Sequence, residues 1–126
     1  MGDTELVSCL CLTRHRVRLL ARAVACFLHQ SYPARELVIV YESDDVDTRE
    51  YVGSLNDPRI RPVEVAKSEG LFLGGLRNRS IDASRGHYVA QWDDDDWHAP
   101  GRLEAQIESG SEQWKAGVPV VSHPGL

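Results

Sequence analysis

The apolar positions of the chain fall into short runs that are separated by segments with helical spacing. Runs of about four to eight apolar or β-branched residues are typical of strands that are buried in a sheet. The pattern predicts strands at Glu5–Leu12, Leu37–Tyr41, Ile60–Val65, His87–Trp92 and Val118–Val121. Ile60–Val65 is more polar than the others, so we expect it near the edge of the sheet.

Between these runs, apolar residues recur at the spacing of an amphipathic helix. The expected helices cover about His15–Gln30, Thr48–Leu55 and Leu76–Ser84, and a fourth begins at Pro100. The fourth helix passes through Leu103 and Ile107 and extends toward Trp114, although Gly110 weakens its second half.

Strands therefore alternate with helices along the chain, which predicts an α/β fold: a mostly parallel sheet with helices on both faces. We expect one domain covering residues 1–126. Three polar loops, Thr13–His15, Glu42–Asp47 and Asp93–Asp96, directly follow predicted strands. Because the carboxyl ends of parallel strands meet at one edge of the sheet, these loops are expected to lie together where ligands bind.

Composition narrows the class of protein and of partner. An apolar fraction of 42%, a charged fraction of 26% and a formal charge of −5 are typical of a soluble globular domain and disfavour nucleic acid as a partner. No apolar stretch approaches the roughly 20 residues of a transmembrane helix, and no basic region opens a signal peptide. Cys9, Cys11 and Cys26 are odd in number and lack CxxC spacing, which indicates reduced, buried thiols and a cytoplasmic protein.

The segment Gln91–Pro100 (QWDDDDWHAP) holds four consecutive carboxylates between two tryptophans. Two unit charges 4 Å apart repel by about 4 kcal/mol at an effective dielectric near 20, so the run favours open water or a nearby cation. Asp93 and Asp95 are spaced to reach one ion, and ligand sets of oxygen atoms select hard cations such as Mg²⁺ or Mn²⁺. The alternative is a solvated acidic loop in which Asp96 caps the following helix.

A second candidate site lies behind the glycine-rich segment Ser68–Gly75. Arg77, Asn78 and Arg79 follow it at the start of a predicted helix, and both helix N-termini and arginines favour phosphate oxygens. For Arg79 an exposed charge is the favoured interpretation, whereas the two interpretations of Arg77 are evenly balanced.

The remaining candidates carry weaker signals. Four acidic residues follow the second strand: Glu42, Asp44, Asp45 and Asp47. One of them is expected to accept a hydrogen bond from a base N–H or a sugar hydroxyl, and the other three to be solvated or to cap the next helix. His98 and His123 are interpreted as surface histidines rather than metal ligands, and Trp97 as structural. No motif indicates a covalent nucleophile.

Three segments, VSCLCLTRHR, ELVIVYESDDVDT and LGGLRNRSIDASRGHYVAQWDDDDWHAPGRL, together resemble the nucleotide-binding half of family 2 glycosyltransferases. The resemblance covers roughly Glu5 to Leu103. It implies a GT-A fold, a nucleotide-diphosphate sugar as donor, an acceptor saccharide or other hydroxyl acceptor, and Mn²⁺ or Mg²⁺ as cofactor. It also allows a peripheral position at the membrane.

The resemblance also implies roles for individual residues. Thr13 would lie in the first loop beside the nucleotide, Glu42 would hold the base-binding position with Asp44 close by, and Arg77, paired with Asn78, would lie near the diphosphate.

Within the aspartate run, the resemblance matches Asp93, Asp95 and Asp96 to the family's DxDD. Asp93 and Asp95 would form the metal-side pair, with Asp95 the expected direct ligand. Asp96 would neighbour the sugar, and Asp94 would have no role of its own.

The chain departs from the family in two places. The family's Asp-Asp-Gly-Ser after the second strand is Tyr41-Glu42-Ser43-Asp44 here, which leaves the base open, with a UDP-sugar as the first expectation. The acceptor half and its aspartate general base have no counterpart, so no catalytic residue is assigned. We therefore expect a metal-dependent, inverting glycosyltransferase that is represented by its donor-binding half. The alternatives are a nucleotide-sugar-binding fragment without catalysis and a nucleotidyltransferase-like enzyme.

Overall fold

The computed structural model describes residues 5–67, 73–109, 112–115 and 118–121. Its strands are β1 (Val7–Leu12), β2 (Arg35–Glu42), β3 (Ile60–Val65), β4 (Tyr88–Gln91), β5 (Glu112–Lys115) and β6 (Val118–Val121). Its helices are α1 (Val17–Leu28), α2 (Val46–Gly53), α3 (Leu73–Ala83) and α4 (Arg102–Ser109). The alternation of strands and helices that the sequence predicts is confirmed. Within the described ranges, no helix combines the length and apolarity needed to cross a bilayer.

The strands form one sheet in the order β3-β2-β1-β4-β6-β5. All neighbouring strands are parallel except β5, which runs antiparallel to β6. The more polar strand β3 lies at the edge, as its sequence predicts. From β1 the chain first adds β2 and β3 on one side and then returns to place β4 on the other side. The order of the strands therefore reverses between β1 and β4, which in sheets of this kind is where ligands bind.

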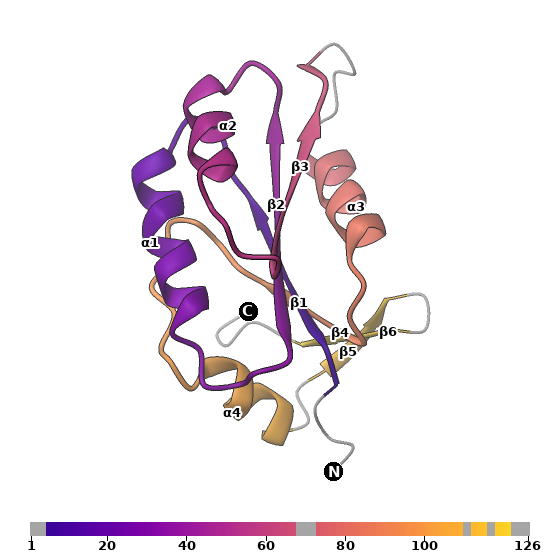
Figure 1. The fold of residues 1–126 in the computed structure, drawn as a ribbon. Helices are drawn as coiled ribbons and strands as arrows, with labels where there is room; N and C mark the ends of the chain where they lie inside the picture. The colour runs from indigo at the N-terminus through magenta and orange to yellow at the C-terminus, as the bar shows by residue number, and fades with distance from the viewer. Residues whose placement is uncertain (1–4, 68–72, 110–111, 116–117, 122–126) are drawn as a thin grey trace.

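Alternate residues of the central strands enter two different layers of the core. Cys9, Leu37 and Trp92 belong to the layer that packs with α1 and the start of α4. Leu10 and Val38 belong to the layer beneath α3. Figure 1 shows α1 and α2 on one side of the sheet and α3 on the other. Both faces of the central strands are covered, which is why their sequences are almost continuously apolar.

Two predicted boundaries differ from the observed ones by three residues or more. Helix α3 begins at Leu73 rather than Leu76, so Gly74 and Gly75 are helical and do not belong to a loop. Residues 68–72 of the predicted loop lie outside the described residues. Helix α4 ends at Ser109, and Trp114 belongs to β5, where it pairs with Pro119. Pairing with β6 gives the backbone N–H and C=O groups of this segment hydrogen-bond partners in the sheet. Such tertiary pairing overrides a weak helical pattern.

A buried ionic cluster joins the amino ends of the central strands to the turn before β4. Glu36 is almost fully buried and accepts hydrogen bonds from the Ser8 hydroxyl (2.6 Å) and from the Arg85 backbone N–H (2.8 Å) and Nε (3.1 Å). Arg61 Nη1 lies 3.4 Å from the same carboxylate. Burial alone raises the pKa of Glu36, but the hydrogen bonds from Ser8 and Arg85 and the charge of Arg61 outweigh it and lower the pKa.

Replacing Gly86 by alanine is expected to reduce the free energy of unfolding by about 1 to 3 kcal/mol, the usual range for overpacking. An added Cβ would lie 2.6 Å from the Leu6 carbonyl oxygen and 2.7 Å from Ser8 Oγ. Gly53, which has open space around it, is the matched control, and Gly53→Ala should cause little change or a gain of up to about 1 kcal/mol. Urea unfolding measures both variants, and equal stabilities would refute the close approach.

Candidate functional site

The loops after β1 and β4 meet where the strand order reverses. The two strands are adjacent and in register, with Leu10 opposite Gln91. Just beyond them, the Thr13 hydroxyl donates a 2.9 Å hydrogen bond to Asp94 Oδ2. The expected convergence of these two loops is therefore confirmed. The aspartate run lies at the edge of the sheet where ligands of parallel α/β domains bind.

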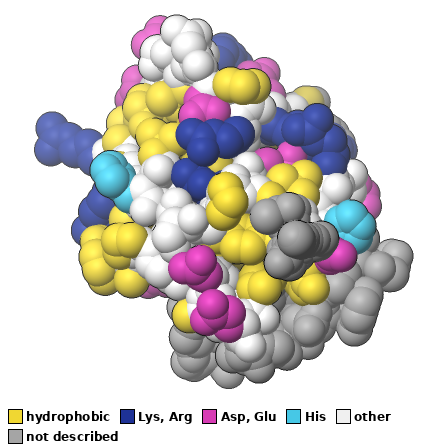
Figure 2. All heavy atoms as spheres, turned by 60° about the horizontal axis from the view of Figure 1, so that its bottom comes forward, with side chains coloured by type: hydrophobic (Ala, Val, Ile, Leu, Met, Phe, Trp, Pro, Cys, Tyr) yellow, Lys and Arg dark blue, Asp and Glu magenta, His cyan; other side chains and the backbone are white. Residues whose placement is uncertain are grey.

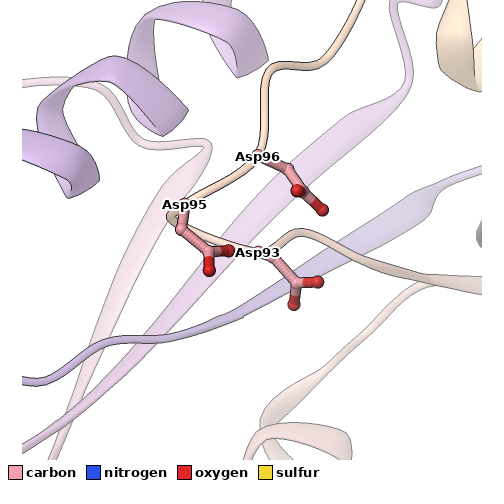
Figure 3. A group of neighbouring side chains, drawn as sticks. All are labelled: Asp93, Asp95 and Asp96. Atoms are coloured by element: carbon pink, nitrogen blue, oxygen red, sulfur yellow. The ribbon is translucent and has the colours of Figure 1, made fainter.

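Three carboxylates of the run form one cluster. Asp93, Asp95 and Asp96 each offer an oxygen atom within 4.8 Å of the others, and Figure 3 shows their side chains leaving a single short loop. Asp95 is exposed, and the other two are half-buried. Arg22 Nη2 donates a hydrogen bond to the Asp95 backbone oxygen (3.3 Å) and not to the Asp95 carboxylate. This set of oxygen atoms, open to solvent on one side, suits Mg²⁺ or Mn²⁺.

Asp94 has a different role from its three neighbours. Asp94 is only 2% exposed, and besides the Thr13 hydroxyl its side chain contacts Arg16, whose Nη2 lies 3.3 Å from Asp94 Oδ1. Burial raises the pKa of Asp94, although Thr13 and Arg16 partly offset this effect. The interpretation of Asp94 as a residue without a role is wrong, because it joins the β4 loop to the β1 loop. Strand periodicity does not extend into a loop, so the sequence could not assign this orientation.

Three buried side chains, those of Trp92, His98 and Arg102, pack against the core side of the aspartate loop. The Trp92 indole N–H donates to the Ala23 carbonyl (3.0 Å), and the ring stacks on His98 with 3.9 Å between centroids. Arg102 Nη1 lies 2.6 Å from His98 Nδ1, and His98 Nε2 lies 3.0 Å from the Asp93 backbone oxygen. Because a guanidinium can only donate, Nδ1 of His98 accepts and its Nε2–H donates. These roles assign the neutral tautomer that carries its hydrogen on Nε2.

The environments of two residues of this run differ from those predicted. His98 is buried, with 3% of its surface exposed, and is not a surface histidine. Trp97, predicted to be structural, is 69% exposed. His98, rather than Trp97, is the residue whose ring stacks on Trp92. His123 lies outside the described residues.

The loop after β2 places a carboxylate between basic side chains. Glu42 is buried at the end of β2, 3.8 Å from Arg14 Nε and 3.6 Å from Lys67 Nζ. Asp44 is exposed and lies 4.0 Å from the same Lys67 nitrogen. Both acids thus lie at the carboxyl edge of the sheet, near the β1 loop that carries Arg14.

Asp45 fixes the β2 loop to the β1 loop. It caps α2 by accepting from the Thr48 N–H (3.2 Å) and hydroxyl (2.7 Å), and it also accepts from the His15 N–H (2.6 Å). Burial raises the pKa of Asp45, but these hydrogen bonds outweigh it and lower the pKa. His15 has a φ of 50°, which is uncommon outside glycine and marks a constrained loop. Asp47 is exposed in the first turn of α2, so the predicted division between capping and solvated acids is confirmed for Asp45 and Asp47.

Helix α3 reaches the same site through one side chain. Arg77 Nη1 donates to Gln91 Oε1 (2.6 Å), and Gln91 Nε2 donates to Asp93 Oδ1 (3.1 Å). Asn78 is exposed. Arg79 is half-buried instead of exposed. Gln91 was not predicted as a site residue, although an amide at the last position of an otherwise apolar strand was an available signal.

Comparison with known proteins agrees with this geometry. Residues 8–123 match the family model described as glycosyl transferase family 2. The chain is 35% identical over 108 residues to a protein of Escherichia coli (strain K12) whose name assigns it to colanic acid biosynthesis as a glycosyl transferase, WcaA. It is also 35% identical over 89 residues to the succinoglycan biosynthesis protein ExoO of Rhizobium meliloti (strain 1021). A third relative, TuaG of Bacillus subtilis (strain 168), is named for teichuronic acid biosynthesis and is 32% identical over 83 residues.

These matches cover 82%, 71% and 64% of this chain but only 37%, 25% and 32% of the respective relatives. The chain thus spans at most about two fifths of the length of the curated relatives it matches. Because the family model matches residues 8–123 of the 126, the chain belongs to glycosyl transferase family 2.

Proposed function

We propose that the chain is the donor-binding part of a glycosyltransferase. The enzyme would transfer a sugar from a nucleotide diphosphate to an acceptor hydroxyl, with inversion and with dependence on Mn²⁺ or Mg²⁺. The observation that carries this proposal is the cluster of Asp93, Asp95 and Asp96 beside the point where the strand order reverses. Family membership supports the reaction class.

In this proposal the aspartates act on the diphosphate side of the donor. Asp93 and Asp95 would hold the cation, and Asp96 would lie beside the sugar. A bound Mn²⁺ or Mg²⁺ would supply Lewis-acid stabilisation of the leaving diphosphate. Arg77 lies on the α3 side of the same cluster, joined to it through Gln91, from where its guanidinium can contact phosphate oxygens.

The nucleoside would occupy the space beside the β1 and β2 loops. Glu42 would accept a hydrogen bond from the base, with Asp44 next to it, and a UDP-sugar is the first donor to test. Thr13 contributes by holding Asp94 with its hydroxyl, so that it shapes the first loop beside the nucleotide.

The proposed reaction also needs an acceptor and a general base, to which no residue of this chain is assigned. A carboxylate base would deprotonate the acceptor hydroxyl for in-line attack on the anomeric carbon. The names of the relatives refer to the biosynthesis of polysaccharides, which supports a saccharide acceptor. Because this chain spans only part of those relatives, binding of a nucleotide sugar without transfer is the second candidate function for the isolated chain.

The three cysteines are free and buried, which supports the cytoplasmic location proposed for the protein.

A thermal-shift panel tests the donor assignment. The chain would be melted with UDP, GDP, CDP and ADP and with their sugar conjugates, each with and without Mn²⁺. A nucleotide present at about 100 times its dissociation constant should add about 2.7 kcal/mol of stability. We expect this gain for one base and only when Mn²⁺ is present. A panel in which no nucleotide shifts the melting temperature would refute the donor-binding function. If a donor does shift it, activity assays with that donor separate transfer from binding.

A further inference from the structure

The side chain of Gln91 contacts both Arg77 and Asp93, a member of the aspartate cluster. Gln91 is the last residue of β4, half-buried, and stands directly before Trp92 and two positions before Asp93. Its amide accepts from Arg77 Nη1 at 2.6 Å and donates to Asp93 Oδ1 at 3.1 Å. The amide therefore lies between a guanidinium and a carboxylate.

These two partners determine which way the amide of Gln91 points. A guanidinium has no acceptor, so the atom facing Arg77 must be the oxygen. An ionised carboxylate only accepts, so the atom facing Asp93 must be the nitrogen. If the amide turned over, both contacts would become repulsive. Arg77 thus holds Gln91 in the orientation that positions the Asp93 carboxylate.

The backbone at the same point is also fixed. Arg102 Nη2 donates to the Gln91 carbonyl (2.8 Å), and His98 donates to the Asp93 carbonyl (3.0 Å). Both ends of the segment Gln91–Asp93 are therefore held from the buried side, and the remaining freedom of Asp93 is the rotation of its side chain. The hydrogen bond from Gln91 restricts that rotation.

We propose that Gln91 is a positioning residue that couples Arg77 to the cation site by orienting Asp93. This inference rests on the proposed function, because it assumes that the aspartate cluster holds Mn²⁺ or Mg²⁺. It predicts that an arginine outside the ligand set controls the affinity for the cation. When the diphosphate of a donor engages Arg77, the same amide links phosphate binding to the geometry of the metal ligand.

The experiment measures the Mn²⁺ dissociation constant, without nucleotide, by following the electron paramagnetic resonance signal of free Mn²⁺. Partners outside the ligand set typically change metal affinity by about 10- to 100-fold when they are removed. Gln91→Leu, which is one atom shorter than glutamine and has no polar side-chain atoms, is expected to weaken Mn²⁺ binding by about tenfold or more.

Arg77→Met gives the sharper test, because two explanations predict opposite signs. If Arg77 acted only through its positive charge, removing it would strengthen the binding of a cation. If Arg77 acts through Gln91, Arg77→Met weakens Mn²⁺ binding. In a chain that already carries Gln91→Leu, the orienting effect is gone, so adding Arg77→Met should leave Mn²⁺ affinity unchanged or raise it.

Arg18→Met, at an exposed position of α1, controls for the loss of one positive charge and should not weaken binding. Melting temperatures of all variants control for folding. An unchanged Mn²⁺ affinity in Gln91→Leu, or a tighter one in Arg77→Met alone, would overturn the coupling while leaving the proposed function intact. Absence of Mn²⁺ binding in the unmodified chain would instead overturn the metal dependence of the proposed function, and the coupling with it.

Discussion

Asp95→Asn is expected to abolish the Mn²⁺-dependent part of nucleotide binding. Asp95 is the exposed member of the cluster, and its carboxylate oxygen lies within 4.8 Å of those of Asp93 and Asp96. Asparagine keeps the size and one oxygen but removes the charge, and hard divalent cations depend on carboxylates for affinity. The cation would in turn neutralise the charge of the diphosphate, so the metal-dependent gain in nucleotide affinity should be lost together with metal binding.

Isothermal titration of the best nucleotide from the thermal panel, with and without Mn²⁺, measures this effect. In the unmodified chain the metal should tighten binding, and in Asp95→Asn the two titrations should coincide. Asp82→Asn, at an exposed position of α3, removes the same charge elsewhere on the molecule and should retain the metal effect. An unchanged metal-dependent affinity in Asp95→Asn would remove Asp95 from the site.

Glu36→Gln is expected to lower the free energy of unfolding at neutral pH by about 2 to 3 kcal/mol. The carboxylate accepts from Ser8 and Arg85 and lies against Arg61. A glutamine oxygen can replace one carboxylate oxygen, but its NH₂ group would then face the arginines, which are also donors. Losing a buried hydrogen bond to a charged group costs about 1 to 3 kcal/mol, and breaking a fully buried ion pair costs more. The arginine side chains reach solvent, which keeps the expected loss below that of a fully buried pair.

The same substitution should change how stability depends on pH. Because the folded-state pKa of Glu36 is lowered, its contribution is fully present above the unfolded pKa, about 4.3, and is lost as pH falls through the folded value. The difference between Glu36→Gln and the unmodified chain should therefore shrink below about pH 4. Urea unfolding at neutral and acidic pH measures it, with Glu50→Gln on the exposed face of α2 as control. A difference that is independent of pH would contradict the ionised state of Glu36.

The apolar pattern by itself determined the fold class and the location of the site. Segments such as Leu37–Tyr41 are apolar at every position because both faces of their strands are buried, and this can be recognised without a structure. The polarity of Ile60–Val65 likewise indicated an edge strand. Once the strands were known to be parallel, the polar loops that follow them had to share one edge. The placement of the aspartate run beside Thr13 follows from this rule.

Only the tertiary structure decided what each polar side chain in those loops contacts. Asp93 and Asp94 are neighbouring residues of the same type, yet one joins the cluster of three carboxylates and the other is buried against Thr13 and Arg16. His98 is buried, whereas Trp97 is exposed, which reverses their predicted environments. Gln91 accepts a hydrogen bond from Arg77, which lies 14 positions earlier in the chain. Strand and helix periods end where loops begin, so the partners of loop residues depend on which distant elements the crossovers bring beside them.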